Sequence, residues 1–387
     1  FYSVAIFAGS LLLYIESGEP QLVFTVSLAL GSYSVGVLAA TALLRFRPSR
    51  EFVLFRSRPW QDTWRGPAFG LAFLVALGTA ALLALLYFRG FGVPLLALNT
   101  EVARLTAVRG AGYLFHGFTL LLTVVLVVAM MKSQFWGGRW RFVEGAVLVL
   151  GFGLLLLTAF RAPLAALIVY FVLSRQLYRT RTEWVKVITL SLLFLLVFGF
   201  VTWRRYTLGM HERALRSAPQ FLAAAIEDRI LLTNPRNLEF VLALFPRRHA
   251  YLGGASYVMG LKALRPGADI GFGGWLTSQH SRRLAGVTGM TPTVVGEFYA
   301  NYGTLGAIAG MLCLGLLIQL IYAQFLRGRK TIGRTAFVVF LTGSLAWTVM
   351  GGLGRFVFAG LAPALVIFWL LHLAGTFRFA PKAARNV

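Results

Sequence analysis

The sequence predicts an all-α, polytopic integral membrane protein, and two observations support this prediction. Hydrophobic residues make up 58% of the 387 residues, and many apolar runs approach the roughly 20 residues that a helix needs to cross a bilayer. In contrast, the segment 204–292 is polar and rich in arginine. We therefore expect one integral membrane domain over residues 1–387, with one large basic loop at 204–292 inside it that carries short helices.

Hydropathy predicts about ten transmembrane helices. The chain begins with Phe1 rather than Met, so we expect residues to precede it, which leaves the total number of spans open. Pro163 lies where the first turn of a helix tolerates proline, which predicts a tight hairpin at 160–163. The expected spans are 1–15, 21–45, 66–88, 112–131, 142–160, 162–178, 185–203, 293–322, 335–356 and 357–377.

Basic residues in the short loops predict the orientation, because cytoplasmic loops carry an excess of Lys and Arg. The excess falls on alternate connections, which we assign to the cytoplasm together with both observed ends of the chain. These connections are 45–65, 132–141, 175–186 and 327–334, with the tail 378–385. The loop 204–292, Arg161 and Arg355 then face outward, to the periplasm or the cell exterior.

The net charge of +24 is largely explained by this topology, so we expect no nucleic-acid partner. The basic excess of the outward loop is unusual, although long loops escape the charge rule. A ligand with phosphate explains it, because guanidinium groups bind phosphate oxygens through paired hydrogen bonds. For any single arginine, a general preference for Arg over Lys in this chain explains it as well.

The small number of cysteines and the spacing of the histidines argue against disulfides and metal sites. Cys313 is the only cysteine and lies in an apolar run, and the five histidines show no metal-ligand spacing. The sequence has no P-loop and no glycine fingerprint for a dinucleotide. We expect no disulfide within the chain, no metal and no cofactor.

Three parts of the outward loop have a recognisable pattern. Apolar residues recur at helical spacing within 219–244, and a turn at 251–257 leads into a short amphipathic stretch. Residues 267–289 are rich in Gly, Ser and Thr, which predicts an irregular segment.

The loop closes with TPTVVGEFYANYGTLG at 291–306, which runs directly into an apolar helix. This motif resembles the P…GE.Y.N.G..G segment of bacterial oligosaccharide repeat-unit polymerases, the Wzy-type O-antigen polymerases. The resemblance extends to Arg161 in an outward hairpin, to Y.GG.SY at 251–257 and to RLTAVRGAGY at 104–113. Together these motifs cover the central and C-terminal two-thirds of the chain.

The resemblance implies a membrane glycosyltransferase of the C-type class on the outer face of the bacterial inner membrane. Both substrates would be undecaprenyl-pyrophosphate-linked glycans: the growing glycan is transferred to the non-reducing end of a new unit, and undecaprenyl pyrophosphate is released. Membrane lipids and a chain-length regulator protein are the further partners that it implies. No nucleotide sugar or metal ion is required.

The residues themselves suggest catalytic roles. Arg161 and Arg355 lie in outward turns between apolar runs, where a fixed guanidinium can stabilise the charge of a departing pyrophosphate. The alternative explanation for these two arginines is that their side chains extend to lipid phosphates and have no catalytic role. Glu297 is the candidate base for the acceptor hydroxyl, and its alternative role is that of a structural partner for a nearby arginine.

Other residues are candidates for substrate contact. Arg229 and Arg265 are placed to bind the second phosphate or sugar, and Arg104 and Arg109 to line the lipid entrance. Sugar contacts are expected from Tyr251, Tyr299 and Asn301, and the reserve bases are His249, His280, Asp228 and Asp269.

Two other functions use the same cationic site. An O-antigen ligase would transfer the glycan to a different acceptor, and a flippase or transporter would bind the pyrophosphate without chemistry. Transporters commonly show repeats and interrupted spans in corresponding halves, and neither pattern occurs in this sequence.

Overall fold

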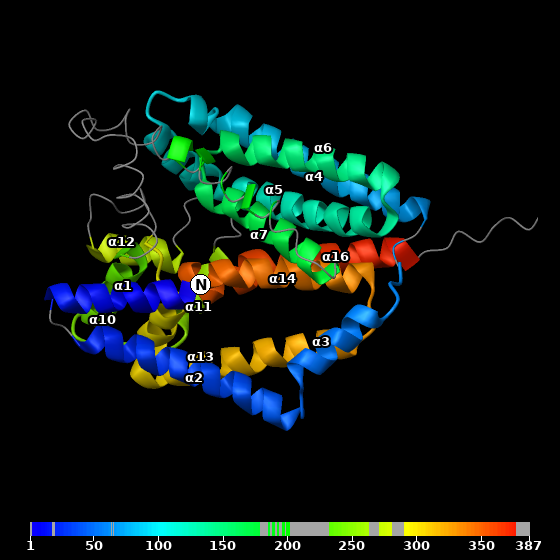
Figure 1. The fold of residues 1–387 in the computed structure, drawn as a ribbon. Coiled ribbons are helices and arrows are strands. Elements are labelled where there is room, and N and C mark those ends of the chain that lie inside the picture. The colour runs from blue at the N-terminus through cyan, green and yellow to red at the C-terminus, as the bar shows by residue number, and fades with distance from the viewer. Residues whose placement is uncertain are drawn as a thin grey trace, which may run out of the picture.

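The computed structural model describes residues 2–17, 20–62, 64, 66–178, 185, 188–189, 192, 196–197, 199–201, 232–262, 271–280 and 290–376. Helices make up nearly all of this part of the chain (Figure 1), which confirms the all-α prediction. Within the described ranges, the β-structure is one isolated bridge between Gln61 and Thr331.

The first half of the chain forms α1 (Tyr2–Ser17), α2 (Pro20–Leu43), α3 (Pro48–Ser57), α4 (Pro67–Phe91), η1 (Pro94–Leu96), α5 (Thr100–Trp136), α6 (Gly138–Leu157) and α7 (Arg161–Tyr178). The second half forms α10 (Thr233–Leu244), α11 (Ala255–Lys262), α12 (Phe272–His280), α13 (Val294–Arg327), α14 (Ile332–Gly351), α15 (Leu353–Arg355), η3 (Phe356–Leu361) and α16 (Ala362–Thr376). The hairpin between α6 and α7 turns within three residues, close to its predicted position.

Six helical stretches are long and apolar enough to cross a membrane: Pro20–Leu43, Pro67–Leu96, Ala111–Trp136, Gly138–Leu157, Val294–Arg327 and Leu353–Thr376. They correspond to six of the ten predicted spans. The predicted spans at 1–15, 162–178 and 335–356 are helical too: α1 and α7 have 16 and 18 residues, and within the described residues the apolar stretch of α14 is Ile332–Ala346. The span at 185–203 lies mostly outside the described residues, so the total of about ten stays a prediction.

The two largest hydrophobic clusters of the described residues hold most of the helices together. The first joins α4, α5, α6, α7, α14 and α16, and α5 lies at its centre with side chains 124–131 almost completely buried. The second joins α1, α2, α10, α12 and α13. In Figure 1, α4–α7 form one layer, α2 and α13 the opposite layer, and α14 lies between them.

The helices α2 and α13 touch backbone to backbone. A Cβ atom added to Gly36 would lie 2.2 Å from the carbonyl oxygen of Leu312, and one added to Gly315 would lie 2.3 Å from that of Tyr33. Any larger side chain at either glycine would push the two helices apart.

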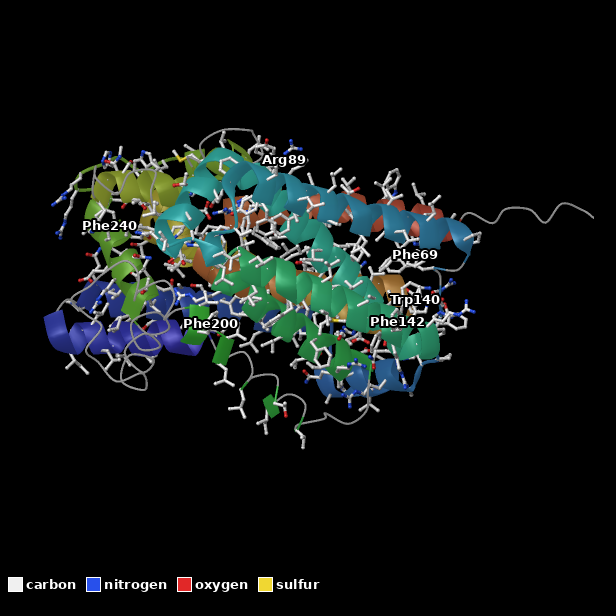
Figure 2. The ribbon with its side chains drawn as sticks, turned by 90° about the horizontal axis from the view of Figure 1, so that it is seen from above. Phe69, Arg89, Trp140, Phe142, Phe200 and Phe240 are labelled. Atoms are coloured by element: carbon white, nitrogen blue, oxygen red, sulfur yellow. The ribbon has the colours of Figure 1, made fainter. Side chains whose placement is uncertain are left out.

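The loops that the charge rule assigns to one side meet at one end of the structure. Arg58 donates to the carbonyl oxygen of Gly328 (2.8 Å), and Lys330 donates to that of Arg56 (3.0 Å). Asp62 forms a buried ion pair with Lys132 at 2.9 Å. Figure 2 shows Phe69 and Trp140 towards this end, with Phe240 towards the other. The grouping of these loops at one end therefore agrees with the predicted topology.

Within the loop 204–292, the structure describes α10, α11 and α12. The helix predicted within 219–244 is present over Thr233–Leu244, and its earlier part lies outside the described residues. The prediction of an irregular segment at 267–289 is wrong for Phe272–His280, which is helical. Burial of Phe272 and Leu276 stabilises this helix, and Gly273 is needed because its Cβ would lie 2.3 Å from the carbonyl oxygen of Met290.

Candidate functional site

The motif at 291–306 folds into a short buried turn of helix followed by a kink. Thr293 caps α13 by accepting a hydrogen bond from the backbone N–H of Gly296 (3.0 Å). The helical dihedral angles are interrupted at Tyr302 and Gly303, and Gly303 has a φ of 67°. A kink frees carbonyl groups that an unbroken helix would satisfy.

The glycine-rich turn before α11 provides partners for those carbonyl groups. The N–H of Leu252 donates to Ala300 (2.9 Å), and the N–H of Gly253 donates to Asn301 (3.1 Å). The N–H of Gly254 donates to the side-chain oxygen of Asn301 at 2.8 Å. The two motifs that carry the family resemblance, at 251–257 and 291–306, therefore pack directly on each other.

Asn301 is fully engaged in holding this turn. Its side-chain nitrogen donates to Ser256 Oγ (2.6 Å) and to the carbonyl oxygen of Glu297 (2.7 Å). Only 1% of the residue is exposed. The structure therefore places this predicted sugar contact in the protein interior.

The carboxylate of Glu297 is also buried, with 2% of the residue exposed, and every donor around it is neutral. Oε1 accepts from Ser256 Oγ (3.0 Å), and the N–H of Gly354 lies 3.2 Å from Oε2. The N–H of Leu353 donates to Oε2 as well. Leu353 and Gly354 begin the continuous helical stretch 353–376, so the carboxylate caps a helix that is distant in sequence.

Gly352 is required for this arrangement. Its φ is +90°, and an added Cβ would lie 2.8 Å from Oε2 of Glu297. Tyr257, on α11, packs beside the carboxylate, and burial together with the negative charge of Glu297 raises the pKa of its hydroxyl. Residues of α11, α13 and α15 thus form one polar cluster around Glu297.

Arg355 follows this capped turn and reaches a different helix. Its Nη2 contacts Nε2 of His116 on α5, while the arginine as a whole is exposed. Because a guanidinium group can only donate, Nε2 of His116 has to accept and the imidazole is neutral in this arrangement. His116 was not among the predicted site residues; the available signal was a polar side chain within an apolar span.

Arg104 lies near the same place. Its guanidinium carbon is 4.5 Å from the centre of the Phe160 ring, and Phe160 packs on Phe115 with ring centres 4.5 Å apart. Phe115 precedes His116 in α5, and Phe160 precedes Arg161, the half-buried first residue of α7. We call Arg104, Arg161 and Arg355, with His116, the arginine cluster.

The remaining predicted residues are distributed differently. Tyr299 is buried and its hydroxyl donates to the carbonyl oxygen of Phe245 (3.4 Å), whereas Tyr251 is 41% exposed and packs edge-on against Tyr299. His249 bonds to Gln279 at 3.0 Å, and His280 packs on Phe240. Outside the described residues lie Arg229, Arg265, Asp228 and Asp269, together with the side chain of Arg109.

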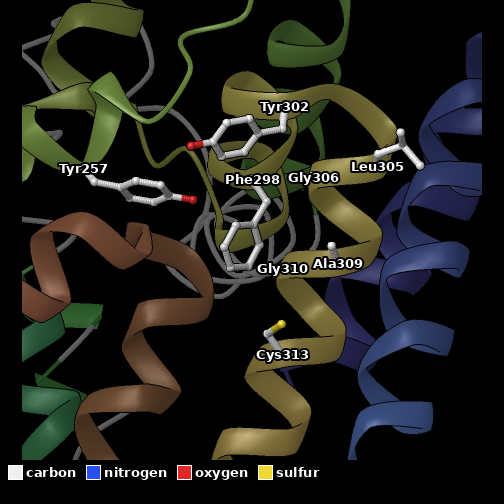
Figure 3. A pocket seen from close by; sticks show the side chains of 8 residues that line it. All are labelled: Tyr257, Phe298, Tyr302, Leu305, Gly306, Ala309, Gly310 and Cys313. Carbon is white, nitrogen blue, oxygen red and sulfur yellow. The ribbon is translucent and has the colours of Figure 1, made fainter.

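An apolar cavity of about 380 Å³ adjoins the polar cluster (Figure 3). It follows α13 from the kink to Cys313, and Tyr257 of α11 faces it from the other side. Its wall consists of Tyr257, Phe298, Tyr302, Leu305, Gly306, Ala309, Gly310 and Cys313. The small residues leave the space open, and the apolar wall suits a hydrocarbon chain.

Among the residues that the structure describes, no group of three or more His, Cys, Asp or Glu side chains could hold a metal ion. In comparisons with known proteins, no family model, no curated protein and no solved structure matches the chain.

Proposed function

We propose that this protein is a membrane glycosyltransferase that polymerises undecaprenyl-pyrophosphate-linked repeat units on the outer face of a bacterial inner membrane. The observation that carries the proposal is the arginine cluster: cationic side chains of α5 and α15 lie beside the start of α7, where Arg161 follows Phe160. The resemblance of 251–257 and 291–306 to Wzy-type polymerases gives the substrate class.

The arginine cluster suits a pyrophosphate leaving group. As the bond between the anomeric carbon and the phosphate oxygen breaks, negative charge grows on the pyrophosphate, and guanidinium groups already in place stabilise it. Arg355 is held on both sides: the turn before it is capped by Glu297, and its own side chain contacts His116. Such preorganisation reduces the reorganisation needed during the reaction.

Glu297 has two proposed roles. As the general base, it would take the proton of the acceptor hydroxyl, but donors occupy both of its oxygens, so a bond to Ser256 or to the 353–354 turn would have to open first. As a positioning residue, it would fix the turn that carries Arg355. The apolar cavity beside it suits the isoprenoid chain of a lipid-linked substrate.

A reconstitution assay tests the proposal. Purified protein in liposomes receives one synthetic undecaprenyl-pyrophosphate repeat unit, and a ladder of products is expected. Transfer only to an added second acceptor would indicate a ligase, and no new glycosidic bond would favour a transporter; either result contradicts the proposal.

A matched pair of variants tests the site. Arg355→Gln should abolish the ladder, because it removes a charge from the arginine cluster. Arg89→Gln removes an exposed arginine at the last turn of α4 and should leave the ladder unchanged. Equal loss in both variants would show a general charge effect and not a site.

A further inference from the structure

The short helix α3 lies at the opposite end from the arginine cluster, and one of its faces is fixed to the body of the protein. Phe55 is completely buried, with its ring centre 4.7 Å from that of Phe325. Glu51 forms an ion pair with Arg327 at 3.2 Å. These contacts set the rotation of α3 about its own axis.

Several basic side chains of this end have partners within the protein. Arg58 donates to the carbonyl oxygens of Leu326, Arg327 and Gly328 at 3.0, 2.8 and 2.8 Å, where α13 ends. This places a cation at the negative end of the helix dipole, a structural role that leaves Arg58 unavailable to an external ligand.

The outer face of α3 is different. Arg50, Val53, Leu54 and Ser57 are exposed, and their spacing places them within about 100° of one another around the helix. Val53 is 65% exposed and Leu54 42%. Arg47, directly before the helix, is exposed too, and within the described structure neither Arg47 nor Arg50 forms a hydrogen bond or an ion pair through its side chain.

We propose that this outer face of α3 binds anionic phospholipid headgroups of the adjacent leaflet. Val53 and Leu54 would enter the upper acyl region, and Arg47 and Arg50 would contact lipid phosphates. Arginine and exposed apolar residues on one arc of a helix are the pattern of an interfacial helix. Leu43, the last residue of α2, is 79% exposed nearby, so the apolar surface of that span continues towards α3.

A lipid surface fits these observations better than an acidic protein. An acidic partner would satisfy the two arginines but would leave no reason for exposed apolar side chains between the ends of membrane helices. A leaflet with anionic lipids satisfies both at once. The inference does not depend on the proposed glycosyltransferase activity.

The experiment uses the full-length protein with Cys313→Ala and Val53→Cys, labelled at residue 53 with the environment-sensitive dye NBD. The labelled protein is placed in nanodiscs of phosphatidylcholine with an increasing fraction of phosphatidylglycerol. We expect a blue shift of NBD emission as phosphatidylglycerol rises, and loss of the shift in high salt.

The variant Arg47→Gln/Arg50→Gln should need far more phosphatidylglycerol for the same shift. Each arginine near an anionic surface contributes about 5-fold in affinity, so the pair contributes roughly 25-fold. The matched control is Arg139→Gln/Arg141→Gln, which removes two exposed arginines from the same end of the protein.

The control should leave the shift unchanged. A shift independent of phosphatidylglycerol would overturn the proposal, and so would equal effects of the two double variants, because the latter would show only the general attraction of a basic membrane face. The nanodiscs contain no other protein. If the outer face of α3 binds an acidic protein and not lipid, the NBD emission should therefore show no blue shift with phosphatidylglycerol.

Discussion

The substitution Glu297→Gln separates the structural role of this residue from a catalytic one. The wild-type carboxylate receives Ser256 Oγ and the backbone N–H groups of Leu353 and Gly354, all in a buried environment. Glutamine keeps the size and one acceptor oxygen. Its NH₂ group takes the place of the other oxygen and faces a backbone donor.

The expected loss of stability follows from these contacts. One buried N–H without an acceptor costs about 1–3 kcal/mol, and loss of the negative charge at the start of a helix costs about 0.3–1 kcal/mol more. Together these effects predict a decrease of about 1–4 kcal/mol in the free energy of unfolding. The matched control is Glu51→Gln, whose pair with Arg327 is partly exposed and should cost less than about 1 kcal/mol.

Denaturant unfolding of the purified protein in detergent micelles measures both variants, and the ladder assay is run on the same preparations. We expect Glu297→Gln to lose stability and to slow polymerisation. If its free energy of unfolding stays within about 0.5 kcal/mol of wild type, the capping argument is refuted. A rate loss of about 10²-fold with unchanged stability would instead support the general base.

Four further predictions concern the site and the topology. Arg161→Lys and Arg161→Ala should both abolish most of the polymer products at normal protein levels, because the ammonium group of lysine cannot form the paired hydrogen bonds that a guanidinium group forms with pyrophosphate. A fully active Lys variant would show that Arg355, and not Arg161, stabilises the leaving group. His116→Leu should weaken inhibition by pyrophosphate about 10-fold, whereas His116→Gln, which can still accept from Arg355, should restore part of it; equal loss in both would contradict the positioning role. EDTA should leave the ladder intact, and activity lost in EDTA but restored by magnesium or manganese would disprove a metal-free reaction. In a Cys313→Ala background, Ser278→Cys should react with an impermeant thiol reagent in intact spheroplasts, and labelling only after lysis would reverse the topology.

The six long apolar helices were predictable because the thickness of the hydrocarbon core fixes the length of a spanning helix, whereas the total of about ten spans stays a prediction. The hairpin between α6 and α7 was predictable for a local reason, the position of Pro163. Residues 272–280 were misjudged because consecutive glycines favour turns, while the contacts that stabilise α12, such as that of Gly273 with Met290, are distant in sequence.

The candidate site was harder to predict for the same reason. Glu297 has a clear position in its motif, but two of its partners are backbone N–H groups 56 and 57 residues away, and backbone groups leave no signature in a sequence. The alternative prediction for Glu297 was a structural pair with a nearby arginine. The donors that its carboxylate contacts in the structure are the hydroxyl of Ser256 and two backbone amides. His116 gained significance only when the fold placed Arg355 against α5.

The turn at 352–355 joins the two hydrophobic clusters at the end of the protein that carries the arginine cluster. On one side it is bound to Glu297 of α13, and on the other Arg355 contacts His116 of α5. Any movement that parts the clusters at this end therefore breaks one of these contacts. If the proposed function holds, a bulky glycan that parts the two clusters here would break one of these contacts, and the proposed reaction would then require the parts to come together again after the substrate has entered.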